Sequence, residues 1–220
     1  MARIISFATQ KGGSGKSTLL MVTAAAIHNR TNKKLLVIDA DPQRSVKHIY
    51  NEDNSKKSFD VIGYNWRQSK AEVNFQKTIQ LAERKYDIIL IDVPGKIEGK
   101  EVFFSVLVSD VVIIPMVASA LDIQSTIDFL KQIPEIRAEK ERQGFPLEVY
   151  GVINKKDQTI EHLQLRQLSG IGGMKLFYSP ISYLARYKRF LSTIHDIADP
   201  TDKNDEFNKY FDEFRTKCYI

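Results

Sequence analysis

The chain has 220 residues, 43% of them hydrophobic, which is enough for one α/β domain with a sizeable core and argues against a disordered chain. Thirty-two Lys and Arg against 27 Asp and Glu leave a formal net charge of +5, which favours an anionic partner. Cys218 is the only cysteine, so an intramolecular disulfide and a thiolate metal cluster within one chain are excluded.

Hydropathy argues against a membrane-spanning or exported protein. No apolar run approaches the roughly 18 residues that a spanning helix needs. The first residues enter a strand-like segment without a charged leader and an apolar signal core, and no helix-turn-helix candidate precedes residue 11. We therefore expect a cytoplasmic protein without stable membrane association.

In chain order, short apolar runs alternate with segments of helical length. The runs are nearly continuously apolar, as in strands that helices cover on both faces. This alternation predicts an α/β fold, a doubly wound and mostly parallel sheet with helices on both faces, in a single domain over residues 1–220. A ligand is expected at the edge where the strands have their carboxyl ends. The expected strands are residues 3–8, 35–39, 87–92, 111–115 and 147–153, and the expected helices are residues 16–30, 71–85, 122–142 and 161–168.

The segment after the first expected strand, residues 9–18, reads TQKGGSGKST, a composition typical of a phosphate-binding loop. Glycines let backbone N–H groups turn toward phosphates, the next helix directs the positive end of its dipole at them, and Lys16 adds a point charge. Ser17 would offer its hydroxyl to Mg²⁺. The candidate nucleotide-binding residues here are Lys11, Gly12, Gly13, Ser14, Gly15, Lys16, Ser17 and Thr18.

This loop departs from the common G-x-x-x-x-G-K-[ST] pattern, because Gln10 stands where the first glycine belongs and a second lysine, Lys11, follows it. The variant resembles the deviant Walker A motif of the ParA/MinD family of P-loop ATPases. The resemblance implies ATP and Mg²⁺ as cofactors. It also implies that Lys11 reaches across a dimer to the nucleotide phosphates of the other subunit.

Carboxylates end the next two strands of the nucleotide site. Asp39 and Asp41 lie in the segment DADPQ, which resembles the family's D-x-D-P-Q motif. The resemblance implies that Asp41 orients or activates the attacking water, as a catalytic residue beside Lys11 and Lys16, and that Asp39 helps to hold the Mg²⁺ shell. Capping of the following helix by both acids is the alternative.

Asp92 ends the strand at residues 87–92, as the acid of a Walker B element does. A buried carboxylate is unfavourable unless a cation compensates it, and Mg²⁺, reached through water, is that cation in sites built on such a loop. Pro94 and Gly95 then begin what would be the second switch loop.

The resemblance thins toward the C-terminus. Asn154 stands where relatives carry the asparagine that reads adenine, and Pro180 lies in a segment that resembles the loop packed against the base. For Asn154 an ordinary turn role is the alternative. The resemblance covers most of the chain, with residues 51–73 the least recognisable.

Family members use ATP to switch between a monomer and a nucleotide-sandwich dimer. In the partition branch the ATP dimer binds DNA without sequence specificity, and a ParB-like or other adaptor protein stimulates hydrolysis. Between Glu161 and Asp196 the chain has no acidic residue, which favours a phosphate-binding surface. The candidate DNA-binding residues are Arg186, Lys188 and Arg189; a solvated helix face is the alternative.

Three other branches share the nucleotide motifs or the fold. A MinD-type membrane-cycling regulator would need a basic amphipathic C-terminal helix, but residues 205–214 carry acids on the polar face, which favours packing of this helix on the core. An iron–sulfur carrier requires a Cys-x-x-Cys pair, which Cys218 alone cannot supply. A ligase of the dethiobiotin synthetase kind should not need Lys11.

Overall fold

A computed structural model of the protein describes residues 1–9, 13–52, 59–95, 99–156, 161–182, 198–199, 201 and 205–220. Eight strands of the described chain form one sheet in the order β3-β2-β4-β1-β5-β6-β7, with β8 pairing with β6. All described strand pairs are parallel. The strands are β1 (Arg3–Phe7), β2 (Leu35–Asp39), β3 (Asp60–Gly63), β4 (Ile88–Asp92), β5 (Val111–Met116), β6 (Glu148–Lys156), β7 (Lys175–Leu176) and β8 (Ile181–Ser182).

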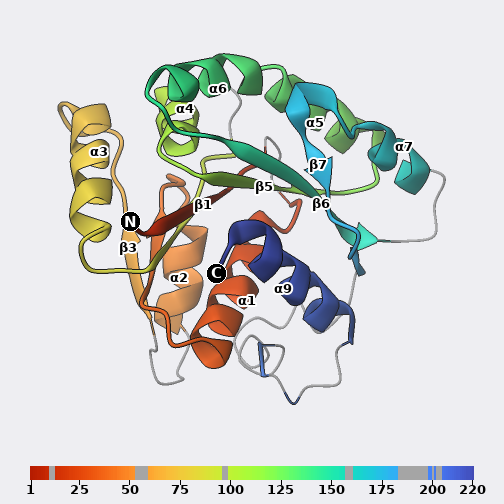
Figure 1. Ribbon diagram of the computed structural model, residues 1–220, viewed down its shortest axis with the longest axis horizontal. Coiled ribbons are helices and arrows are strands. Elements are labelled where there is room, and N and C mark those ends of the chain that lie inside the picture. Colours follow the sequence, from red (N-terminus) through yellow and green to blue (C-terminus); the bar gives the residue numbers. More distant parts are fainter. Residues whose placement is uncertain are drawn as a thin grey trace.

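Helices cover both faces of this sheet, as the sequence predicts (Figure 1). One face carries α1 (Lys16–Arg30), α2 (Ser45–Glu52) and α9 (Asp205–Cys218). The other carries α3 (Ala71–Ala82), α4 (Lys100–Leu107), α5 (Ala120–Leu130), α6 (Ile133–Arg142) and α7 (Glu161–Gln167). A short 3-10 helix, η1 (Ile171–Gly173), precedes β7. The expected doubly wound α/β fold is confirmed.

Two hydrophobic cores lie on the two sides of the sheet. Side chains of a strand alternate between its faces, so Ile5 and Phe7 of β1 contact one core while Ile4 contacts the other. The residues of β2, β4 and β5 are buried throughout, which explains why the sequence shows continuous apolar runs there. No helix in the described part of the chain is long and apolar enough to cross a membrane.

The expected single helix over residues 122–142 is wrong. The structure has two helices in its place, because α5 ends at Leu130 and α6 begins at Ile133 with Pro134 in its first turn. Proline has no backbone N–H and its ring clashes with the carbonyl four residues earlier, so a continuous helix through Pro134 is disfavoured. No element was predicted from the sequence for α2, β3, α4, β7 and β8.

The final helix, α9, packs on the core as expected. Its apolar residues are Phe207, Tyr210, Phe211 and Phe214, each at most 1% exposed. The hydroxyl of Tyr210 lies 3.1 Å from the hydroxyl of Thr23 in α1, and the Arg30 guanidinium of α1 lies over the rings of Phe207 and Phe211. These contacts join the two ends of the chain in one core.

Candidate functional site

The phosphate loop joins β1 to α1 at the carboxyl edge of the sheet. Gly13 and Gly15 have φ values of 87° and 84°, a left-handed conformation that glycine adopts without strain. A Cβ atom on Gly13 would meet nothing within 4 Å, so the backbone conformation, and not lack of space, requires a glycine there. The Thr9 and Ser14 hydroxyls lie 3.0 Å apart across the loop. Lys11 and Gly12 lie outside the described residues.

Lys16, the first residue of α1, brings three of the predicted site residues together. Its ammonium lies 2.5 Å from Asp92 Oδ1 and 3.8 Å from Asp41 Oδ2, and the residue is only 7% exposed. Lys16 follows β1 after the phosphate loop, Asp41 follows β2 and Asp92 ends β4, and these three strands are neighbours in the sheet. The parallel topology therefore gathers the lysine and two of the predicted carboxylates at one point.

Asp92 is completely buried at the end of β4. Burial raises the pKa of its carboxyl, whereas the Lys16 charge and the hydrogen bonds from Lys16 and Ser17 oppose that rise. The Ser17 hydroxyl donates to Asp92 Oδ2 over 2.9 Å. Two of the residues predicted to bind Mg²⁺, Ser17 and Asp92, are thus in contact. Thr18 comes directly after Ser17 in the first turn of α1.

Asp39 pairs in register with Asp92 across β2 and β4, but its carboxylate has other partners. Oδ1 accepts the backbone N–H of Asp41 over 3.2 Å, and Oδ2 accepts that of Lys47 in α2 over 2.8 Å. Burial raises the pKa of Asp39 to about 6, although the hydrogen bond from Lys47 lowers it. This geometry favours the capping alternative for Asp39.

Asp41 links the loops that follow β2 and β4. Its Oδ1 accepts the N–H of Gln43 over 2.9 Å, and its Oδ2 accepts the N–H of Gly95 over 3.2 Å. The side chain is 14% exposed, so solvent reaches it, in contrast to Asp92. A carboxylate that is held by backbone amides and still touches solvent can orient a water molecule.

Asn154, the predicted adenine-reading residue, contacts the phosphate loop. Its side-chain amide donates to the carbonyl oxygen of Ser14 over 2.7 Å, and the residue is only 7% exposed. Asn154 also pairs in register with Ile181, the residue after Pro180. Asn154 on β6 and Pro180 just before β8 therefore lie near one another, and Asn154 supports the phosphate loop as well.

The loop before Pro180 is anchored by α9. The backbone N–H groups of Tyr178 and Ser179 donate to the two carboxylate oxygens of Glu213, each over 2.9 Å. Glu213 was not among the predicted site residues, because nothing local marks an acid on a terminal helix as the partner of a distant loop. Thr9, Arg44 and Trp66 were not predicted either. Thr9 and Arg44 contact residues only five positions away, whereas the contact of Trp66 with Ala40 spans 26 positions.

The residues present fit Mg²⁺. Oxygen atoms of Ser17, Asp41 and Asp92 gather near the phosphate loop, and oxygen ligands are those that Mg²⁺ prefers. Among the described residues no group of three or more His, Cys, Asp or Glu could hold a metal ion by itself. Mg²⁺ would therefore be shared between a few protein oxygens, phosphate oxygens and water, as is common for this ion.

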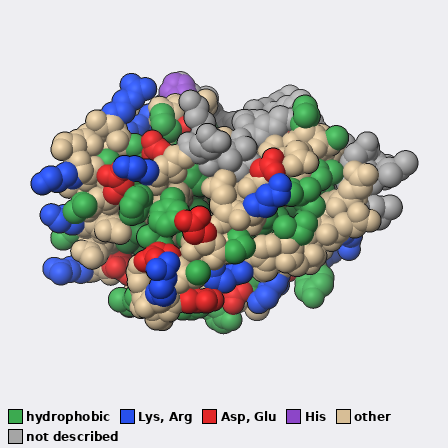
Figure 2. Space-filling model, turned by 90° about the horizontal axis from the view of Figure 1, so that it is seen from above, with side chains coloured by type: hydrophobic (Ala, Val, Ile, Leu, Met, Phe, Trp, Pro, Cys, Tyr) green, Lys and Arg blue, Asp and Glu red, His purple; other side chains and the backbone are tan. Residues whose placement is uncertain are grey.

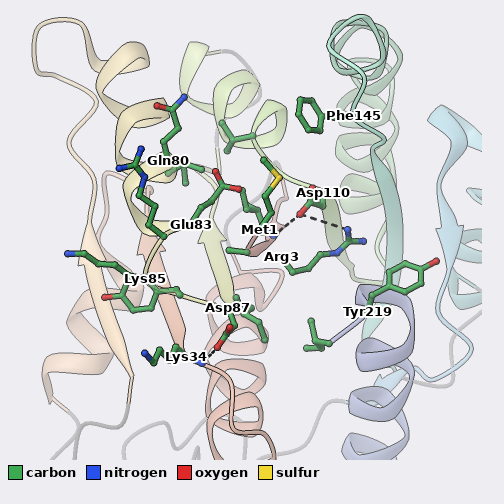
Figure 3. Close-up of a pocket in the computed structure, with 18 of the residues that line it drawn as sticks. Met1, Arg3, Lys34, Gln80, Glu83, Lys85, Asp87, Asp110, Phe145 and Tyr219 are labelled. Atoms are coloured by element: carbon green, nitrogen blue, oxygen red, sulfur yellow. Dashed lines mark hydrogen bonds and ion pairs between the residues drawn. The ribbon is translucent and has the colours of Figure 1, made fainter.

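A groove of about 940 Å³ lies at the opposite, amino edge of the sheet (Figure 3). Charges of both signs line it: Arg3 pairs with Asp110 at 3.9 Å, and the carboxylate of Asp87 accepts the backbone N–H of Lys34. None of the predicted site residues that the structure describes lines this groove. The nucleotide motifs meet only at the carboxyl edge, as the rule for parallel sheets predicts.

Comparison with known proteins agrees with this geometry. Residues 5–197 match the model of the CobQ/CobB/MinD/ParA nucleotide binding domain. The chain belongs to this family. The family contains P-loop ATPases, among them ParA-type proteins with roles in positioning, which matches the family predicted from the phosphate loop.

One curated relative is the maintenance of carboxysome distribution protein A from Halothiobacillus neapolitanus, 25% identical over 133 residues. The match spans 60% of this chain and 59% of that relative. The chain therefore spans less than two thirds of the length of this relative.

Solved structures show the same fold over nearly whole chains. A plasmid partition protein from Borrelia burgdorferi B31 bound to AMPPNP has a TM-score of 0.70 at 20% identity, covering 100% of this chain and 98% of that one. A McdA variant from Cyanothece in complex with ATP has a TM-score of 0.72 at 16% identity, covering 100% and 97%. Cobyrinic acid a,c-diamide synthase from Mycobacterium smegmatis with ADP and magnesium has a TM-score of 0.75 at 16% identity, covering 99% and 96%.

Proposed function

We propose that this chain is a Mg²⁺-dependent ATPase that acts as a dimerisation switch. In this proposal the ATP dimer binds DNA without sequence specificity, and ATP hydrolysis to ADP and phosphate serves to position or segregate a plasmid, a chromosome or a mobile element. The observation that carries the proposal is the convergence of Lys16, Asp41 and Asp92 beside the phosphate loop. The nucleotides bound to the similar structures support ATP and Mg²⁺ as the cofactors.

Each residue of the site has a role in this proposal. Lys16 leaves its carboxylate partners to pair with phosphate oxygens, and backbone N–H groups of residues 13–17 surround them. Ser17 would hold Mg²⁺ directly and Asp92 would hold it through water, while Asp39 holds the strand end to α2. Bound Mg²⁺ would neutralise charge on the phosphate oxygens during transfer. Asp41 aligns a water molecule for in-line attack, and Asn154 and Pro180 lie at the adenine.

The dimer brings in residues outside the described part of the chain. Lys11 from each subunit completes the phosphate site of the other, and Arg186, Lys188 and Arg189 contribute to a joined basic surface for DNA. A ParB-like or other adaptor protein stimulates hydrolysis, since a switch that hydrolyses quickly cannot hold its state. The side of the molecule that Figure 2 shows has acidic and basic side chains interspersed over its described part, which favours a DNA contact elsewhere.

A second candidate is a MinD-like or cargo-positioning regulator in the cytoplasm. The likeness to a carboxysome distribution protein favours cargo positioning. Membrane cycling through the C-terminal helix is disfavoured, because the apolar face of α9 is buried in the core and its first turn carries Asp205 and Glu206. Co-sedimentation with anionic liposomes in ATP tests it: pelleting of the protein would favour the membrane branch.

Binding to random-sequence duplex DNA with ATP, with ADP and without nucleotide, across a salt series, tests the main proposal. We expect binding only with ATP, with affinity falling steeply as salt rises. The variant Arg186→Glu/Arg189→Glu should bind more weakly, with a salt slope reduced by about 2 if both residues contact phosphates.

A matched control is Arg84→Glu/Lys85→Glu, which reverses two exposed cations at the amino edge of the sheet. It should bind as the wild type does. If the wild type binds DNA in no nucleotide state, the DNA role is wrong. The ATPase proposal is tested separately, by phosphate release.

A further inference from the structure

The turn that carries Asp41 has an unusual backbone at Arg44. The φ angle of this residue is 57°, a left-handed conformation that side-chain-bearing residues rarely adopt. Such a conformation persists where the surrounding structure holds it, and it is found often at functional sites. The contacts of the Arg44 side chain show what holds this residue in place.

The Arg44 guanidinium joins the ends of β2 and β3. Nη1 donates to the carbonyl oxygen of Asp39 over 2.6 Å, and Nη2 donates to that of Tyr64 over 2.5 Å. A Cβ atom on Gly63 would lie 2.5 Å from Nη1, so this approach requires the glycine at the end of β3. The arginine thus lies against the backbone that supports the Asp41 turn.

Trp66 holds the same turn from a second direction. Its indole N–H donates to the carbonyl oxygen of Ala40, the residue between the two carboxylates, over 3.0 Å. The ring packs against Tyr64 and against Phe75 of α3, with centroids 4.8 and 4.7 Å apart. Because Phe75 is completely buried, the indole has a fixed support.

Every backbone carbonyl from Asp39 to Asp41 therefore accepts a hydrogen bond. Asp39 accepts from Arg44 and from the Tyr64 N–H, Ala40 accepts from Trp66, and Asp41 accepts from the Arg44 N–H. The donors lie at residues 44–66, partly within the segment that resembles the family least.

We propose that Arg44 and Trp66 are positioning residues that fix Asp41 for hydrolysis. The inference rests on the proposed function, because it assigns Asp41 to the attacking water. A displacement of about 1 Å in a catalytic group can lower a rate by roughly 100-fold, so a turn that is held on all of its carbonyls has a direct catalytic value. Arg44 and Trp66 act only through Asp41 and touch no substrate.

The variant Arg44→Gly tests the guanidinium without disturbing the backbone, because glycine adopts a φ of 57° readily. We expect kcat for ATP to fall by about tenfold or more, while the affinity for a fluorescent ATP analogue stays within about twofold of wild type. Trp66→Phe, which keeps the aromatic packing and removes the N–H, should lower kcat in the same way.

Lys70→Gly is the matched control. Lys70 has a φ of 53° and an exposed side chain, so the substitution removes the same charge from the same backbone conformation. Its kcat and its nucleotide affinity should equal those of the wild type.

Amide hydrogen exchange over residues 39–47 supplies a readout that does not depend on hydrolysis. Exchange should be at least about tenfold faster in Arg44→Gly than in the wild type and unchanged in Lys70→Gly. Unchanged exchange in Arg44→Gly would overturn the proposal, and so would faster exchange with an unchanged kcat. If the wild type releases no phosphate and Asp41→Ala changes nothing, the proposed function fails and the positioning role fails with it, whatever the exchange shows.

Discussion

The Lys16–Asp92 pair is the most consequential residue-scale feature of the site. Both groups are buried and 2.5 Å apart, so each compensates a charge that would otherwise be very unfavourable away from water. In the proposed function the same lysine pairs with phosphate oxygens when nucleotide binds. Because Lys16 would pair with either Asp92 or the phosphates, the stability of the fold and the binding of nucleotide depend on the same side chain.

This connection predicts the effect of Lys16→Met. The variant should lose ATP binding and also about 3 kcal/mol of unfolding free energy, because Asp92 is left buried without its cation. The double variant Lys16→Met/Asp92→Asn should recover at least half of that stability without recovering ATP binding. Urea unfolding and ATP titration measure the two effects; a double variant as unstable as the single one would contradict the role given to the pair.

Asp41 differs from Asp92 in being reachable by solvent, and this predicts a different phenotype. Asp41→Ala should bind ATP, form the dimer and remain in it, because the phosphate loop is intact while the water is no longer aligned. Size-exclusion chromatography in ATP together with phosphate release tests this. Asp128→Ala, an acid on α5 paired with Lys131, should behave as the wild type does; rapid phosphate release by Asp41→Ala would rule out the assigned role.

At the scale of elements, α9 joins the hydrophobic core to a loop beside the candidate site. Its buried aromatic residues contact α1, and Glu213 holds the loop before Pro180. The helix also buries Cys218 completely, and burial raises the pKa of this thiol far above its usual range. The thiol is therefore a reporter of whether α9 is docked.

We expect Cys218 to react with a thiol reagent at pH 8 far more slowly in the native protein than in urea, since the thiolate is disfavoured and covered. Phe211→Ala should lower the unfolding free energy by about 3–5 kcal/mol and speed the labelling, because it leaves a cavity beneath the helix. Lys209→Ala, on the exposed face of α9, is the control. Equal labelling rates in the two variants would show that α9 does not depend on this packing.

For the whole molecule, the strand order decides which motifs meet. The phosphate loop follows β1, Asp41 follows β2 and Asp92 ends β4, and these three strands are neighbours in the sheet. All of them open on the carboxyl edge, so two molecules that meet there can share a nucleotide site. That geometry is what a dimerisation switch requires.

Lys11→Ala is the corresponding whole-molecule prediction. The variant should bind ATP and stay monomeric, because the lysine is assigned to the phosphates of the other subunit while Lys16 serves its own. Light scattering with and without ATP measures this, and Lys33→Ala, an exposed lysine beside the groove at the amino edge, is the control. Normal ATP-dependent dimerisation of Lys11→Ala would make the cross-subunit role wrong.

Short-range patterns in the sequence were sufficient to predict several elements of the fold. The continuous apolar runs predicted the buried strands β2, β4 and β5, the glycines and Lys16 placed the start of α1, and the spaced aromatic residues of α9 predicted its buried face. These succeed because burial on both sides and helical periodicity leave a local trace. The edge strand β3, with its alternating exposure, left a weaker trace and was not predicted.

The pairing of residues that are far apart in the sequence became visible only in the folded chain. Lys16 and Asp92 are 76 positions apart, Asn154 and Ser14 are 140, and the bond from Trp66 to Ala40 depends on β3 lying beside β2. Such contacts follow from the order of strands in the sheet, which no local pattern specifies. The chemistry of the phosphate loop was therefore visible in the sequence, whereas the hydrogen bonds that hold its partners in place became visible only in the fold.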